Sequence, residues 1–195
     1  MKRPVLIVID MLNDFLDQWE GDIRLRLTRS INELVQSIRR VDCPVIWIRQ
    51  EFDPDLRDAF PEMRAKGIRI TIKGTPGCQI VPELVPVSTD TVIVKKRYSG
   101  FYETSLDASL KVLQPDALIL AGINTHACIR TTAIDAYQRD WQVVLASDCI
   151  GSYDEQHHEI SLKYMRERIA SVMTNRQICT ALGLHQDSET PPQSA

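Results

Sequence analysis

The chain alternates short apolar runs with longer segments of helical period, and this alternation constrains the fold more than any other feature. Strands of a parallel sheet read as continuous apolar runs, because helices cover both faces of the sheet. We interpret as strands the runs at residues 4–9, 44–49, 91–94, 116–122, 142–147 and 170–173. The segments of helical period are residues 23–40, 106–113, 126–139 and 154–169, with a last helix that ends at residue 182. We therefore predict an α/β protein, with three layers (α/β/α) around a central, mostly parallel, Rossmann-like sheet of six strands.

Residues 50–80 interrupt this pattern. They are polar and contain six proline and glycine residues, so we predict a long irregular excursion with one short strand at residues 68–72. No repeat and no shift in composition marks a second domain, and residues 1–183 are interpreted as a single domain. The polar residues 184–195 are expected to form a disordered C-terminal tail.

Composition excludes several classes of protein. A chain of 195 residues with 44% hydrophobic residues and a formal net charge of −3 can bury a core of its own. Its 23 Lys and Arg against 26 Asp and Glu leave no positive surplus for nucleic acid. No apolar run approaches the roughly 20 residues that span a bilayer, so we expect no membrane partner. The five cysteines are odd in number and not closely spaced, which indicates free thiols in a reducing compartment. We expect a cytoplasmic protein.

Three polar residues lie where predicted strands end, at the edge of the sheet where α/β proteins bind ligands. Asp10 follows an apolar strand and suits a general base or a partner for a cation, although a cap on the next turn is an alternative. Lys95 ends another strand and would hold a carboxylate and a thiolate in place, although Lys-Lys-Arg also suits a solvated turn. Cys128 comes at a predicted helix start, which favours a thiolate, although most free cysteines are buried packing residues.

Three segments carry a resemblance to a known family. Residues 8–15 read VIDMLNDF, residues 95–101 read KKRYSGF, and residues 122–136 read GINTHACIRTTAIDA. In this order and spacing they resemble the isochorismatase-like cysteine hydrolase family, and the resemblance runs from about residue 4 to residue 182.

The resemblance implies roles for the three strand-end residues. Cys128 would be the nucleophile, Asp10 the general base and Lys95 the third member of a triad. Lys95 is chosen over its neighbour because the lysine of the family precedes the Tyr-Ser-x-Phe segment by three positions. The family also has a cis peptide that here would join Ile123 to Asn124, with the backbone N–H groups of Asn124 and Cys128 forming an oxyanion hole.

The reaction implied is hydrolysis of a carbon–nitrogen bond in a small amide, carbamoyl or ureido compound, through a thioester. Two alternatives stay open. One is isochorismatase-type hydrolysis of a vinyl ether, which releases pyruvate. The other is a non-enzymatic role as a thiol redox sensor or scaffold. The resemblance also implies a homo-oligomer, a dimer or tetramer, whose only other partner is a small-molecule substrate.

We predict no metal and no cofactor. The nicotinamidase branch of the family uses an aspartate and several histidines for a divalent metal, whereas all four histidines here lie at position 126 or later. Glu51 and Asp53 could hold a hard cation, but a solvated acidic loop is the simpler interpretation.

Residues near the predicted strand ends are candidates for substrate contact. Core packing is the alternative for the aromatic ones, and a salt bridge on a helix surface is the alternative for the arginine. His126 lies two residues before Cys128, but a short turn rarely presents two such side chains to each other, so we assign it no catalytic role. The candidates are Phe15, Trp19, Gln50, Tyr98, Phe101 and Arg130.

Overall fold

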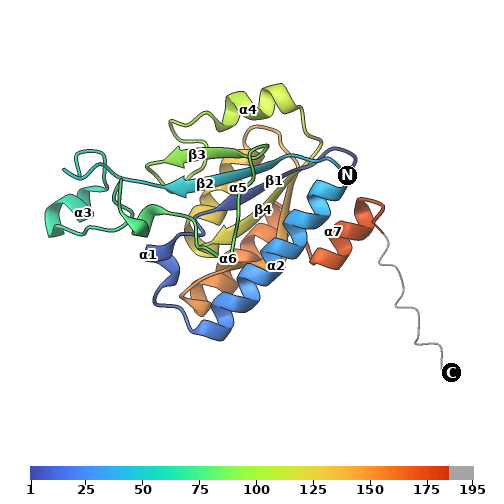
Figure 1. Cartoon of the computed structure of the whole chain (residues 1–195). Helices are drawn as coiled ribbons and strands as arrows, with labels where there is room; N and C mark the ends of the chain where they lie inside the picture. The colour runs from blue at the N-terminus through green and yellow to red at the C-terminus, as the bar shows by residue number, and fades with distance from the viewer. Residues whose placement is uncertain (185–195) are drawn as a thin grey trace.

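A computed structural model describes residues 1–184 of the chain and contains a parallel sheet of six strands (Figure 1). The strand order is β3-β2-β1-β4-β5-β6, and each of the five pairings is parallel. The predicted six-stranded α/β fold is confirmed. The strands are β1 (Val5–Ile9), β2 (Val45–Gln50), β3 (Thr91–Lys95), β4 (Leu118–Ile123), β5 (Val143–Gly151) and β6 (Ser171–Met173).

Two helical layers bury the faces of this sheet. Leu6 and Val8 of β1 belong to one apolar core, whereas Ile7 and Ile9 belong to the other, because successive strand residues point to opposite faces. The first core is closed by helices α2 (Gly21–Arg40) and α7 (Asn175–Ala181). The second is closed by α4 (Leu106–Leu113), α5 (Arg130–Tyr137) and α6 (Glu155–Arg168).

The direction of strand succession reverses between β1 and β4. Segments that leave the carboxyl ends of these two strands diverge, and such a switch point forms the ligand crevice of many α/β proteins. Gly122 of β4 pairs with Ile9 of β1 and has a φ of +110°. A Cβ atom at Gly122 would overlap the backbone oxygen of Ile9, so only glycine allows this approach. Asp10 and residues 124–128 are thereby brought to the same edge of the sheet.

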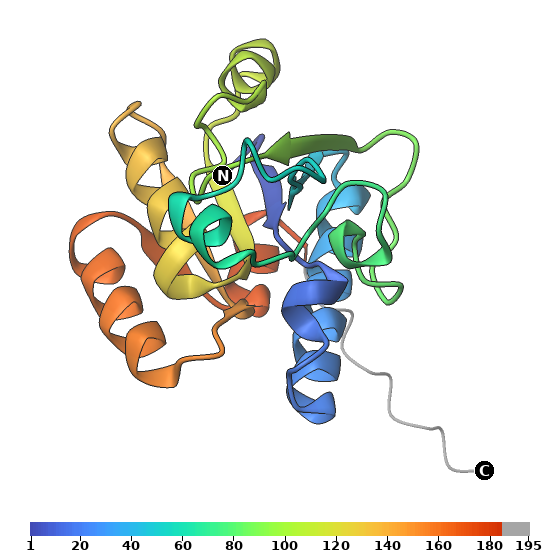
Figure 2. The ribbon, with the colours of Figure 1, turned by 90° about the vertical axis from the view of Figure 1, so that its left-hand side faces the viewer.

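The excursion at residues 50–80 is more ordered than predicted. It contains helix α3 (Pro61–Lys66) and a 3-10 turn, η1 (Pro76–Cys78), and a short helix α1 (Asn13–Leu16) follows β1. The strand predicted at residues 68–72 is wrong, because this segment makes only one isolated bridge, from Ile72 to Phe52. Ile68 and Ile72 instead pack in a small separate core with Phe52, whereas Ile70 is exposed. Figure 2 shows α1 and α3 in front of the end of the sheet that carries the site.

Several boundaries also differ from those predicted. β5 extends to Gly151, four residues beyond its predicted end, and a π-helical turn, η2 (Thr125–Ile129), precedes α5. Of the predicted tail at residues 184–195, all but Leu184 lies outside the described residues. None of the helices in residues 1–184 combines the length and the apolar character needed to cross a membrane.

Candidate active site

Lys95, the last residue of β3, is a buried lysine with a fully engaged ammonium group. Its side chain has 0% relative exposure. Nζ lies 2.6 Å from Oδ2 of Asp10 and 3.4 Å from Sγ of Cys128, and it donates to the backbone oxygen of Arg97 at 3.0 Å. The ammonium therefore has an ion pair with Asp10 and hydrogen bonds to Arg97 and Cys128. Lys96 faces the other side of the strand and pairs with a different carboxylate. The structure therefore brings Lys95, and not Lys96, to Asp10 and Cys128.

Asp10 is placed by an unusual backbone turn at the end of β1. Its φ is +56°, in the left-handed region, and its side chain is fully buried. Oδ1 accepts a hydrogen bond of 3.0 Å from the backbone N–H of Gln50, and Oδ2 pairs with Lys95. A buried carboxylate is costly unless such partners compensate its charge. The carboxylate is thus held between β2 and the lysine, and does not cap the turn that follows it.

Cys128 lies in the π-helical turn between β4 and α5. The Ile123–Asn124 peptide bond just before this turn is cis, as the resemblance implies. The backbone N–H groups of Ala127 and Ile129, on either side of the cysteine, both donate to the backbone oxygen of Asn124. These bonds fix the turn, so that the thiol faces the carboxyl ends of β1 and β3.

The surroundings of Cys128 keep its sulfur protonated. Burial and the charge of the Asp10 carboxylate raise the pKa of the Cys128 thiol, and the opposing effect of Lys95 is smaller than the two together. The expectation that the helix start favours a thiolate is wrong, because Cys128 is only 6% exposed and faces a carboxylate. For Lys95, burial lowers the pKa, but the attraction of Asp10 and Cys128 outweighs it and the pKa is raised. The resting site therefore holds a neutral thiol beside an ammonium.

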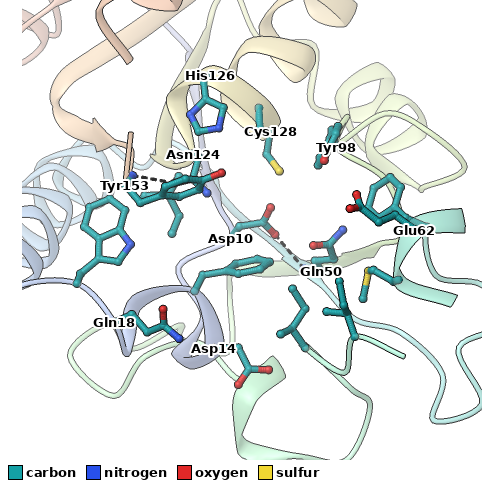
Figure 3. Close-up of a pocket in the computed structure, with 18 residues that line it drawn as sticks. Asp10, Asp14, Gln18, Gln50, Glu62, Tyr98, Asn124, His126, Cys128 and Tyr153 are labelled. Atoms are coloured by element: carbon teal, nitrogen blue, oxygen red, sulfur yellow. Dashed lines mark hydrogen bonds between the residues drawn. The ribbon is translucent and has the colours of Figure 1, made fainter. Parts of the chain in front are cut away.

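A cavity of about 500 Å³ opens over Asp10 and Cys128 (Figure 3). Four of the predicted substrate contacts line it: Phe15, Trp19, Gln50 and Tyr98. Figure 3 shows the Asp10 carboxylate near the middle of these side chains, with Gln50 and Cys128 beside it. The strand-end positions therefore converge on one space that is large enough for a small molecule.

Two predicted contacts lie elsewhere, and these predictions are wrong. Phe101 is buried in the core on the α4 side, where the Arg139 guanidinium lies 4.6 Å from the centre of its ring. Arg130 points toward α6, with its guanidinium 5.2 Å from the centre of the Tyr164 ring. Two residues after Cys128, a helical backbone has turned by more than half a revolution, so Arg130 faces away from the cavity.

More than half of the residues that line the cavity are not predicted from the sequence. Part of this wall comes from α3 and the residues after it, where Pro61 begins the helix and Gly67 ends it with a φ of +64°. Proline at the first position and glycine just after the end are helix signals that could have revealed α3. The unpredicted lining residues are Asp14, Gln18, Phe60, Glu62, Met63, Ile68, Ile70, His126, Ala127 and Tyr153.

The acidic residues that could hold a hard cation are engaged in ion pairs. Glu51 lies 2.8 Å from Arg49, and Asp53 lies 3.2 Å from Arg57. In the part of the chain that the structure describes, no three His, Cys, Asp or Glu side chains gather into a group that could hold a metal ion.

Comparison with known proteins places this chain in a family. The isochorismatase domain family matches residues 4–177. An isochorismatase family protein of Bacillus subtilis, YaaI, is 29% identical over 181 residues, which cover 89% of this chain and 94% of that protein.

Solved structures agree with this match. An isochorismatase family protein from Desulfovibrio vulgaris is 28% identical with a TM-score of 0.86, covering 94% of this chain and 100% of that one. N-carbamoylsarcosine amidase from Thermoplasma acidophilum is 28% identical with a TM-score of 0.76, covering 89% and 96%. The chain therefore belongs to the isochorismatase-like hydrolase family.

Proposed function

We propose that this protein is a cysteine hydrolase that cleaves a carbon–nitrogen bond in a small amide, carbamoyl or ureido compound through a thioester on Cys128. The observation that carries the proposal is the meeting of a thiol and a carboxylate at one buried ammonium, beside a cavity. The similarity to a structure named N-carbamoylsarcosine amidase supports carbon–nitrogen hydrolysis.

In the first half of the reaction, Asp10 acts as base and then as acid. Its carboxylate accepts the thiol proton while Sγ of Cys128 adds to the carbonyl carbon of the substrate. The tetrahedral intermediate then collapses. Asp10 gives the proton to the nitrogen, which leaves as ammonia or an amine, and the acyl group remains on Cys128 as a thioester.

In the second half, water takes the place of the amine. Asp10 accepts a proton from the water as its oxygen adds to the thioester carbon. Collapse of the second intermediate breaks the carbon–sulfur bond, and Asp10 returns the proton to the thiolate. The product acid leaves, and Cys128 is again a neutral thiol.

The raised pKa of Cys128 makes a base necessary. A resting thiol is a poor nucleophile, so its proton must move as the bond to carbon forms. Lys95 has the position to stabilise both partners of this transfer, since Nζ lies 2.6 Å from the carboxylate oxygen and 3.4 Å from the sulfur. Its positive charge balances whichever of the two groups is negative.

The oxyanion of each intermediate needs hydrogen-bond donors. We assign this role to the backbone N–H groups of Asn124 and Cys128, in the fixed turn after β4. One such donor typically contributes about 2.7–4 kcal/mol to the stability of the transition state. Because the donors belong to the backbone, no single side-chain substitution removes them.

The structure also bears on the redox alternative. Sensor thiols are exposed and have a low pKa, because oxidation begins at the thiolate. Cys128 is 6% exposed and its pKa is raised by burial and by Asp10, so it lacks both properties. This favours a nucleophile that is activated only when a substrate is bound.

An ammonia-release screen over small amide, carbamoyl and ureido compounds tests the proposal, with the wild type and Cys128→Ala compared in the presence of a chelator. We expect release by the wild type, none above background by the variant, and no effect of the chelator. Activity in the variant would refute the role of Cys128, and loss with chelator would refute metal independence. Pyruvate formation from isochorismate, with no ammonia from any compound, would assign the protein to vinyl ether hydrolysis instead.

A further inference from the structure

Gln50, at the end of β2, offers the cavity a polar group that the protein does not use. Its side chain lines the cavity and the residue is only 4% exposed. Nε2 has no hydrogen-bond partner among residues 1–184. A buried donor of this kind is normally paired. Figure 3 shows the carboxamide next to Asp10, on the side of the cavity toward Glu62. An oxygen of a bound ligand would supply the missing acceptor.

The charges on the cavity wall are almost all negative. Among the described residues, no lysine or arginine lines the cavity, whereas the carboxylates of Asp10, Asp14 and Glu62 do. The charge of Asp10 is balanced by Lys95. Glu62 pairs with Lys66 at the exposed mouth, where solvent screens both charges. Asp14 makes no ion pair with any group in residues 1–184 and accepts a backbone hydrogen bond of 2.5 Å from Thr71.

Two basic residues, His126 and Arg97, lie at or near the wall. Burial and the neighbouring His157 lower the pKa of His126, which disfavours the charged form of its ring. Arg97 keeps its positive charge but does not line the cavity: its guanidinium lies 5.2 Å from the centre of the Phe60 ring and donates to the backbone oxygens of residues 58 and 96.

Five aromatic rings form much of the remaining wall. The faces of such rings are electron-rich and attract cations rather than anions, although that of Phe60 already contacts the Arg97 guanidinium. An anionic ligand would meet these rings and the unbalanced charge of Asp14. The rings belong to Phe15, Trp19, Phe60, Tyr98 and Tyr153.

We propose that the cavity selects amide or ureido compounds without negative charge, binds positively charged ones best, and holds the carbonyl end of the ligand through the side-chain amide of Gln50. This inference rests on the proposed function for the reacting group, but the preference for charge rests on the cavity wall alone. A dicarboxylate such as isochorismate is excluded on the same ground.

Three benzamides of matched size provide the test: meta-(aminomethyl)benzamide, meta-methylbenzamide and meta-carboxybenzamide. Their binding to Cys128→Ala is measured by calorimetry at neutral pH, where this variant holds the ligand without thioester formation. We expect the cation to bind about tenfold more tightly than the anion, with the neutral compound between them. The difference should shrink as salt is added, because ions screen charges at the mouth.

Variants at two positions separate the cavity wall from the net charge of the protein. Ile70 lines the cavity and is 37% exposed, whereas Val112 lies on α4, 83% exposed and outside the cavity. Ile70→Lys should remove or reverse the preference for the cation, and Val112→Lys should leave it unchanged. Gln50→Leu should weaken the binding of all three compounds by a similar factor, roughly tenfold, because it removes a hydrogen-bond donor whose contribution does not depend on the charge of the ligand.

The outcomes are distinct. Anion binding as tight as cation binding, no saturable binding of any of the three compounds, or equal effects of the two lysine variants would each overturn the inference. Ammonia release by the wild type is measured separately on the same compounds. If no ammonia is released but the three compounds bind in the expected order, the result would contradict the proposed reaction and would still support the selection of ligands by charge.

Discussion

Replacement of Lys95 by methionine should leave Asp10 as a buried charge without a cation. Both side chains are fully buried, and Nζ lies 2.6 Å from the carboxylate. Removing one partner of a buried ion pair typically destabilises a protein by about 3–5 kcal/mol, because the other charge stays desolvated. For a chain of this size, such a loss lowers Tm by roughly 6–20 °C. We expect Lys95→Met to be destabilised by this amount and to be inactive.

The double variant Asp10→Asn with Lys95→Met tests the reason for that loss. If the uncompensated carboxylate is the cause, neutralising it should restore most of the stability, to within about 1–2 kcal/mol of the wild type. The double variant should nevertheless stay inactive, since it lacks the base. Urea unfolding of the four proteins of this cycle gives the coupling energy directly.

Lys96→Met is the matched control. Lys96 is the next residue, but its side chain is 33% exposed and its partner Asp58 is 22% exposed. A pair that reaches solvent in this way contributes about 1 kcal/mol or less. The reasoning is refuted if Lys95→Met costs no more stability than Lys96→Met, or if the double variant is as unstable as Lys95→Met alone.

Three further predictions concern the backbone, the thiol and the assembly. Gly122→Ala should lower the free energy of unfolding, measured in urea, by about 1–3 kcal/mol more than Gly74→Ala does. Both glycines have positive φ, but only a Cβ at Gly122 would overlap the backbone of Ile9. Equal losses would contradict the close approach of β1 and β4. The raised pKa of Cys128 means that the folded protein keeps a proton that an unfolded thiol, with a pKa of about 8.5, releases as pH rises. The free energy of unfolding of the wild type should therefore fall above about pH 8.5, by up to about 1.4 kcal/mol per pH unit from this group. In urea unfolding between about pH 8 and 10, the free energy of unfolding of Cys128→Ala should fall less steeply. Parallel curves for the two proteins would show that the pKa of the Cys128 thiol is not raised. Light scattering should give a mass of two or four times 22.2 kDa, and a mass of 22.2 kDa would contradict the expected homo-oligomer.

The centre of the site could be predicted from the sequence because the ends of apolar strands can be identified in it. Asp10 and Lys95 are polar residues that directly follow or end apolar runs, and parallel strands bring such positions to one edge. The resemblance then selected Lys95 over Lys96. Both choices agree with the side-chain geometry, because alternation along β3 turns Lys96 away.

The electrostatic state of Cys128 could not be predicted in this way. A helix start favours a thiolate, but burial and the facing carboxylate of Asp10 act more strongly in the opposite direction. Both effects depend on how distant segments close over the thiol. The burial of Cys128 and its proximity to Asp10 therefore cannot be predicted from its position in the sequence alone.

The outer wall of the cavity was missed for a related reason. Ile68 and Ile70 belong to the segment for which a strand is predicted, and β-branched residues do suit strands. In the structure Ile70 lines the cavity and Ile68 packs beside Phe52, because α3 carries this segment over the end of the sheet. Tertiary packing decided the outcome where local propensity favoured a strand.

Mass spectrometry of the acid-quenched enzyme during turnover tests the role of Cys128 most directly. With a compound from which the wild type releases ammonia, we predict a mass increase equal to the acyl group, located on the peptide that contains Cys128. Cys128→Ala should show neither the adduct nor the release of ammonia. Release of ammonia by Cys128→Ala at the wild-type rate, without any adduct on the protein, would contradict thioester catalysis at this site.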